Sequence, residues 1–213
     1  MTVSRVQRRL LPLLLAMFVA CYVDRVNVGF AALQMNRALG LSAAAYGLGA
    51  GVFFLGYALL EIPSNLALAR LGARVWIARI MISWGVISSA TLLARGAPSF
   101  YALRFLLGAA EAGFFPGIIF YLGQWFPDRA RARVIALFMV ALPVAGIVSG
   151  PASGVLLGLS GTLGLQGWQW LFLVEGIPSV ALGVVALIYL TDRPEQARWL
   201  DPAQRVWLAE TLR

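Results

Sequence analysis

The sequence predicts an all-α integral membrane protein with six transmembrane helices, and three observations support this. Of the 213 residues, 61% are hydrophobic and only 12% are charged, whereas about 25% of the residues of a soluble domain are charged. Six segments are long and apolar enough to cross the hydrocarbon core of a bilayer, which takes about 20 residues of helix. Arginines gather at the ends of these segments, which is how membrane topology is encoded.

The first three predicted spans are separate apolar runs, at residues 10–33, 46–69 and 76–94. The first follows three arginines, as the apolar core of a signal peptide does. Such a core has only about 7–15 residues and precedes soluble sequence. Because five further apolar segments follow here, we interpret the first run as a retained span. The second is anchored by the uncharged run 41–60.

The last three spans are predicted at residues 100–125, 134–157 and 170–190. The fifth and sixth share one long uncharged run that ends at Val174. Glycine, serine and threonine between residues 159 and 167 are typical of a turn, so we place the boundary between these two spans there.

Arginines also mark one side of the predicted bundle. They occur at the amino terminus, between spans two and three, between spans four and five, and in the tail, whereas the opposite loops hold only Arg37 and Arg95. Since positive loops stay in the cytoplasm, both termini are predicted to be cytoplasmic. The chain then divides into an amino terminus (1–9), a six-helix transmembrane domain (10–190) and a cytoplasmic tail (191–213).

The tail is predicted to contain a short amphipathic helix at the cytoplasmic interface. Asp201, Pro202 and Gln204 supply an N-cap, a proline at the first helical position and a capping-box partner. Apolar residues follow at helical spacing, with charged residues on the other faces.

Composition excludes several classes of function. The net charge of +8 comes from arginines against nine acidic residues, but no basic helix or aromatic groove accompanies it, so we expect no nucleic-acid partner. The chain has no histidine, which removes Ser-His and Cys-His catalysis. Cys21 is the single cysteine and makes neither an intrachain disulfide nor a metal site. We therefore expect no enzyme, no cofactor and no metal.

Four charged residues lie inside predicted spans: Asp24 and Arg25 in the first, and Arg104 and Glu111 in the fourth. A charge at bilayer depth is costly and persists mainly where it faces a partner or a water-filled cavity. Spans one and four must therefore turn a face inwards. This pattern indicates a membrane protein that moves something polar or ionic.

Four stretches carry a resemblance to a known family: residues 22–29 (YVDRVNVG), 61–74 (EIPSNLALARLGAR), 104–117 (RFLLGAAEAGFFPG) and 168–176 (WQWLFLVEG). With them the chain resembles the major facilitator superfamily, and within it the anion:cation symporter family. Two positions depart from the pattern. Ala69 stands where the general signature has an acidic residue, as is common in this family, and Gln169 stands where an arginine is usual.

The resemblance implies a fold and a function. Members typically have twelve spans in two halves, so the chain is expected to form the amino-terminal half, with two inverted three-helix repeats. The implied function is secondary active transport: proton-coupled symport of a small organic anion, such as a sugar acid or dicarboxylate, across a bacterial inner membrane. The expected partners are the anion, the proton, the lipid bilayer, and the carboxyl-terminal half or a second copy. The alternative is a non-transporting scaffold or receptor, or a fragment inactive without its other half.

Arg25 is the leading candidate for substrate binding, because a guanidinium presents a planar fork to a carboxylate and keeps its charge when desolvated. Resemblance suggests that Tyr57 faces the cavity and can bind substrate as well. Arg104 and Asn27 are the remaining candidate substrate contacts.

Asp24 and Glu111 are the candidate proton-coupling carboxylates. Arg104 and Glu111 are seven residues apart and share one helix face. Glu111 is flanked by glycine and phenylalanine and is poorly solvated, and burial disfavours the charged form. Asp24 is expected to pair with Arg104 across the empty cavity. The competing interpretation is that these charges only hold the helices together.

Further polar and small residues leave two interpretations open. Glu61 can form a cytoplasmic gate with Arg70, Arg74 or the loop between the fourth and fifth spans, or simply a helix-end ion pair. The role of Glu175 in the sixth span is open between the same two interpretations. The repeated glycines of the fifth span, Gly146, Gly150 and Gly154, are typical of close helix packing.

Overall fold

The computed structural model describes residues 2–212, without the side chain of Arg129. The described chain is helical and contains six helices or helix pairs long and apolar enough to cross a membrane, which confirms the predicted fold class. The elements are α1 (Thr2–Leu39), α2 (Ala43–Leu71), α3 (Ala73–Ala90), η1 (Thr91–Leu93), α4 (Ala97–Glu111), α5 (Phe114–Gly123), α6 (Asp128–Gly158), η2 (Thr162–Gly164), α7 (Gly167–Tyr189), η3 (Pro194–Gln196) and α8 (Pro202–Thr211).

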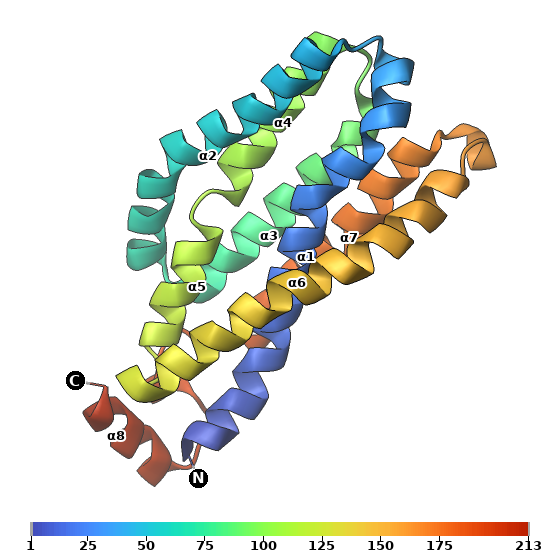
Figure 1. Cartoon of the computed structure of the whole chain (residues 1–213). Helices are drawn as coiled ribbons and strands as arrows, with labels where there is room; N and C mark the ends of the chain where they lie inside the picture. Colours follow the sequence, from blue (N-terminus) through green and yellow to red (C-terminus); the bar gives the residue numbers. More distant parts are fainter. Residues whose placement is uncertain (1, 213) are drawn as a thin grey trace.

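The helices pack in pairs that reflect an internal repeat (Figure 1). Helix α2 lies along α4, α1 along α6, and α3 along α7. Spans one to three are α1, α2 and α3, and spans four to six are α4 with α5, α6 and α7. Exchanging each span of the first set with the corresponding span of the second turns the α2–α4 pair into the α6–α1 pair. The same exchange leaves the α3–α7 pair unchanged. This is the arrangement expected of two three-helix repeats. Both termini lie at the same end of the bundle (Figure 1).

Glycines allow the closest of these helix approaches. A Cβ on Gly108 of α4 would collide with the backbone of Phe53 in α2, and one on Gly56 of α2 would collide with the backbone of Phe105. The two helices therefore touch backbone to backbone, as small residues permit in membranes.

The fourth span is broken, where the sequence predicted one continuous helix over residues 100–125. Helix α4 ends at Glu111, and α5 starts at Phe114. Between them Gly113 adopts φ +83°, a conformation that suits glycine. Pro116 also has no N–H to donate to the Ala112 carbonyl, four residues earlier. That carbonyl instead accepts a 2.6 Å hydrogen bond from Ser64 Oγ of α2.

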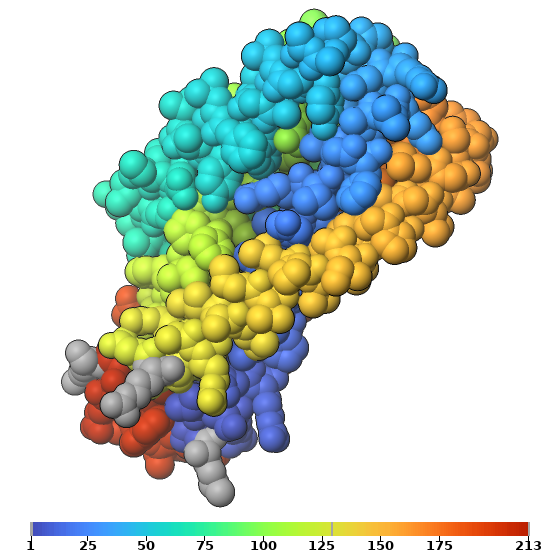
Figure 2. All heavy atoms as spheres, in the orientation of Figure 1, coloured from blue at the N-terminus to red at the C-terminus, as the bar shows by residue number. Residues whose placement is uncertain are grey.

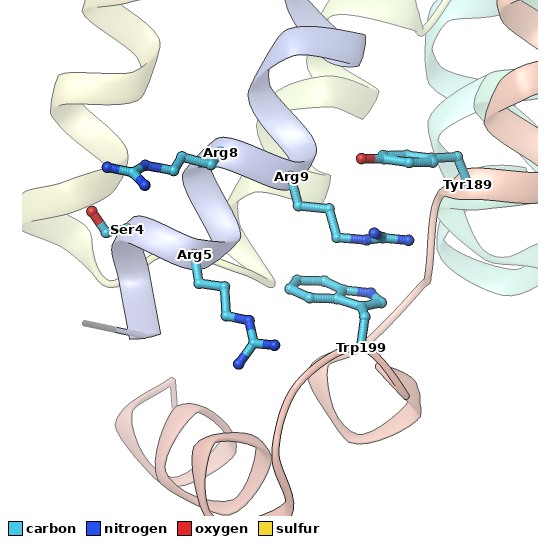
Figure 3. Close-up of a pocket in the computed structure, with 6 residues that line it drawn as sticks. All are labelled: Ser4, Arg5, Arg8, Arg9, Tyr189 and Trp199. Carbon is cyan, nitrogen blue, oxygen red and sulfur yellow. The ribbon is translucent and has the colours of Figure 1, made fainter.

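The tail folds back onto the start of α1. Helix α8 begins at the predicted capping box of Asp201 and Gln204, and Arg5 donates to both side chains, at 3.1 and 3.2 Å. Figure 3 shows Arg9 between the rings of Tyr189 and Trp199, whose centroids are 4.4 and 5.0 Å from its guanidinium carbon. Cation–π contacts of this kind hold the tail against the amino-terminal helix.

The glycine stripe of α6 is not packed against another helix within the described residues, so its predicted role in close packing is not tested by this structure. A Cβ on Gly150 or Gly154 would meet no atom within 4 Å, and one on Gly146 would only reach the Tyr22 ring at 3.9 Å. Helices α2 and α6 are the least buried of the six spans. Figure 2 shows the face on which they lie on either side of α1.

Candidate functional site

An ion pair between Arg25 and Glu111 forms the centre of the site. Arg25 projects from α1, and its Nη2 donates to Glu111 Oε1 at the end of α4. The Cys21 thiol, one turn before Arg25, donates to the same oxygen at 3.2 Å. The Glu111 side chain is 1% exposed and that of Arg25 39% exposed, so the pair joins a buried anion to a partly accessible cation.

The pair lies on the wall of a cavity of about 390 Å³ between α1, α2, the broken fourth span and α6. Tyr57 of α2 lines the same cavity, and its ring centroid is 5.5 Å from the Arg25 guanidinium carbon. The rest of the wall is mostly aromatic and apolar: Phe18, Cys21, Tyr22, Phe114, Phe115, Met139 and Leu142. A small molecule held here would meet the Arg25–Glu111 pair, the phenols of Tyr22 and Tyr57, and apolar surface.

Asp24 lies on a different face of α1 from Arg25 and does not line this cavity. Its carboxylate accepts hydrogen bonds from Trp84 Nε1 at 2.6 Å, from the Ser88 hydroxyl, and from Asn27 Nδ2 at 3.1 Å. Asp24 and Asn27 are each 1% exposed, and neither lines the cavity. Burial disfavours a charged carboxylate, and the three donors offset part of that cost.

Arg104 is also buried, at 4% exposure. Its guanidinium carbon lies 4.6 Å from the Phe53 ring centroid, and its Nε and Nη1 have no hydrogen-bond partner among the described residues. An arginine with unused donors beside an aromatic ring is held in place without being neutralised.

The expected pairing of Asp24 with Arg104 is wrong for this conformation. Arg104 makes no ion pair with a described residue, although its charge is near enough to act on Asp24. The reason is local, because α3 already supplies Asp24 with two donors.

The predicted pairing of Glu61 with Arg70 or Arg74 is not formed among the described residues. Glu61 is half-buried, and Arg70 and Arg74 are exposed. None of the three belongs to an ion pair among the described residues. The Arg74 backbone N–H instead donates to Asp192 Oδ1 at 2.8 Å, which ties the α2–α3 turn to the segment after α7.

The sequence did not identify the α3 partners of Asp24 or the contact of Cys21 with Glu111. Trp84 and Ser88 are four residues apart and therefore lie on one face of α3, and both are fully buried. A buried indole N–H needs an acceptor, so this pair was a signal that α3 faces a polar group. Which group it faces is decided only by the packing of α3 against α1.

The chain is similar to proteins that are described as transporters. The sequence pattern described as "Major Facilitator Superfamily" matches residues 13–211. The chain is 55% identical to a "putative tartrate transporter" of Agrobacterium vitis, covering 98% of this chain and 48% of that protein. It is 52% identical to the "putative metabolite transport protein NicT" of Pseudomonas putida, covering 98% of this chain and 48% of that protein. The chain thus spans about half the length of these relatives.

Two solved structures share the fold. A bacterial homologue of the human lysosomal transporter Spinster, inward-facing and occupied, matches with a TM-score of 0.81 at 22% identity, over 88% of this chain and 45% of that one. The proton:xylose symporter XylE, bound to 6-bromo-6-deoxy-D-glucose, matches with a TM-score of 0.75 at 14% identity, over 98% of this chain and 50% of that one. At such identities the likeness shows the fold alone.

Proposed function

Because the chain belongs to the Major Facilitator Superfamily, we propose that it forms the amino-terminal half of a secondary active transporter and that it couples a small organic anion to protons. The relatives named as tartrate and metabolite transporters support the anion. The cavity supports a small substrate, since it has room for a compact molecule and presents one guanidinium to it.

The ion pair between Arg25 and Glu111 is the observation that carries this proposal. In the pair, the Glu111 carboxylate is bound to the Arg25 guanidinium, which is the group that a substrate carboxylate would bind. A proton added to a Glu111 oxygen removes that competing charge. The Arg25 guanidinium is then free to hold the substrate carboxylate through two parallel N–H···O bonds. Proton binding and anion binding would therefore favour each other.

The remaining predicted residues take supporting roles in the proposal. Tyr57 lies in the cavity wall and can donate its hydroxyl to the anion. Asp24 is the second coupling carboxylate. Arg104 and Asn27 would reach substrate only in a conformation whose cavity extends further along α1. Glu61, Arg70 and Arg74 would form the gate in a state closed to the side on which the termini lie.

The surroundings of the protein belong to the same proposal. The relatives in Agrobacterium and Pseudomonas favour a bacterial inner membrane. The arginine-rich loops lie at the end that carries both termini, which favours a cytoplasmic location for that end. The uncovered faces of α2 and α6 would bind the carboxyl-terminal half, or a second copy of this chain.

The test is a titration of the purified chain in lipid nanodiscs with tartrate, with bound anion and proton uptake measured together. We expect uptake of a proton with each anion, no binding in Arg25→Gln, and binding with reduced proton uptake in Glu111→Gln. The tail variant Glu210→Gln serves as the control. If the chain alone binds nothing, the titration is repeated with the carboxyl-terminal half of the Agrobacterium relative co-expressed. Normal binding in Arg25→Gln, or unchanged proton uptake in Glu111→Gln, contradicts the proposal.

A further inference from the structure

Glu175 in α7 is a buried carboxyl that the mechanism above does not use. Its side chain is 9% exposed, and neither Oε1 nor Oε2 has a hydrogen-bond partner among the described residues. A carboxylate buried without donors or a cation is costly, whereas the protonated form carries no charge and has an O–H to donate. The position therefore suits a neutral carboxylic acid.

The neighbours of Glu175 can accept that hydrogen bond. The Asn27 amide of α1 and the Ser153 hydroxyl of α6 lie beside the carboxyl, and Asn27 Oδ1 and Ser153 Oγ have no partner within the described chain. Ser179, one turn further along α7, is fully buried, and its hydroxyl is also unpartnered. Unused polar groups from three helices thus gather around Glu175, and native interiors seldom leave such groups unpaired.

Asn27 connects this cluster to Asp24. Its Nδ2 donates to Asp24 Oδ1 at 3.1 Å, so one amide contacts one carboxyl and lies beside the other. The two carboxyls differ in their environments, because Asp24 accepts from three donors and Glu175 from none. In such contrasting environments one carboxyl is ionised and the other is protonated.

The other charges around Glu175 are few. Asp24 of α1 is the charged group that acts on Glu175, whereas the charge of Arg104 in α4 acts on Asp24. Helices α3 and α6 place Trp84, Ser88 and Ser153 in this region, and none of these titrates in the range of a carboxyl. Glu175 therefore responds chiefly to Asp24.

We propose that Glu175 is a second proton-binding carboxyl that shares one proton with Asp24 through the Asn27 amide, in a buried site between α1, α6 and α7 that is separate from the Arg25–Glu111 pair. With Asp24 ionised, the proton is on a Glu175 oxygen and its O–H donates to Asn27 Oδ1 or to Ser153. Its part in coupling rests on the proposed function, but its protonation state does not.

The test is infrared difference spectroscopy of the chain in lipid nanodiscs, in H₂O and D₂O, which reports protonated carboxyls directly and needs neither substrate nor transport. At neutral pH we expect a protonated-carboxyl band that disappears in Glu175→Gln and persists in the tail variant Glu195→Gln. At the same pH the band should weaken in Asp24→Asn, because ionising Glu175 then no longer places a second negative charge beside Asp24.

Two outcomes overturn the proposal. A spectrum unchanged by Glu175→Gln means that Glu175 is ionised in the wild type. A Glu175 band of equal strength in wild type and Asp24→Asn means that the two carboxyls do not share a proton. If Glu175→Gln fails to fold, the Asp24→Asn spectrum still decides, since it leaves Glu175 in place. Failure of anion binding alone would leave these spectra as predicted, so the two proposals fail separately.

Discussion

Ser64 of α2 donates a 2.6 Å hydrogen bond to the carbonyl oxygen of Ala112, at the break in the fourth span. Trp76 of α3 donates its indole N–H to the same hydroxyl at 2.9 Å. Because Pro116 has no N–H, Ser64 replaces the partner that the Ala112 carbonyl would have in a continuous helix. The break is thereby fastened to two other spans, and it holds Glu111 at the end of α4, opposite Arg25.

We predict that Ser64→Ala destabilises the chain. The substitution leaves the Ala112 carbonyl and the Trp76 N–H without partners, and interhelical hydrogen bonds in membranes contribute about 0.6–1.7 kcal/mol. The free energy of unfolding, measured by denaturing-detergent titration in micelles, should fall by roughly that amount. Ser160→Ala, in the exposed loop after α6, is the control. Equal stability of the two variants would show that the hydrogen bond contributes nothing.

Gly113→Ala should be costlier still. Gly113 has φ +83°, and an added Cβ would lie 2.5 Å from Ser64 Oγ. A residue other than glycine in such a conformation costs about 1–3 kcal/mol, before the steric conflict with Ser64 is counted. Gly47→Ala in α2, where a Cβ meets no atom within 4 Å, should keep or raise stability in the same titration. A Gly113→Ala variant as stable as Gly47→Ala would show that the break is not fixed by this glycine.

The sequence predicted what depends on composition and local signals. Apolar run lengths predicted the six spans, and the Asp201–Gln204 capping box predicted α8. The break after Glu111 was missed, although Gly113 and Pro116 are both local signals, because the apolar run continues through it. Hydropathy reports burial in lipid and does not report the continuity of the helix.

The candidate site was predicted in its residues but not in its pairings. The cost of charge in a bilayer identified Asp24, Arg25, Arg104 and Glu111. Which of them meet depends on how each helix is rotated about its axis, and Arg25 and Asp24 of α1 contact different helices. That rotation is set by packing partners such as Trp84, which lies 60 residues from Asp24 along the chain.

Trp84→Phe tests whether α3 holds Asp24. The variant keeps the ring but removes an N–H that donates to Asp24 Oδ2 at 2.6 Å, and hydrogen bonds to charged groups contribute about 1.5–3 kcal/mol. Trp125→Phe is the matched control, because Trp125 is equally buried and its Nε1 has no partner among the described residues. We expect Trp84→Phe to lower the free energy of unfolding by more than Trp125→Phe. The reverse order would show that Asp24 does not need this donor.

The glycine stripe of α6 predicts where a second half, or a second copy, binds. Small residues let membrane helices approach closely, and within the described chain no atom lies within 4 Å of a Cβ placed on Gly150 or Gly154. Gly150→Leu should therefore change the free energy of unfolding of the chain by no more than about 0.5 kcal/mol, as surface substitutions do. It should weaken the association of the chain with the co-expressed carboxyl-terminal half of the Agrobacterium relative, or with a second copy of itself.

Analytical ultracentrifugation in detergent measures that association. Gly108→Leu is the contrasting variant. Its side chain would collide with the α2 backbone at Phe53 and Tyr57, so it should destabilise the chain itself rather than the assembly. Unchanged association of Gly150→Leu would mean that the stripe faces lipid, because a leucine side chain is accommodated by acyl chains but not by a helix packed against glycine.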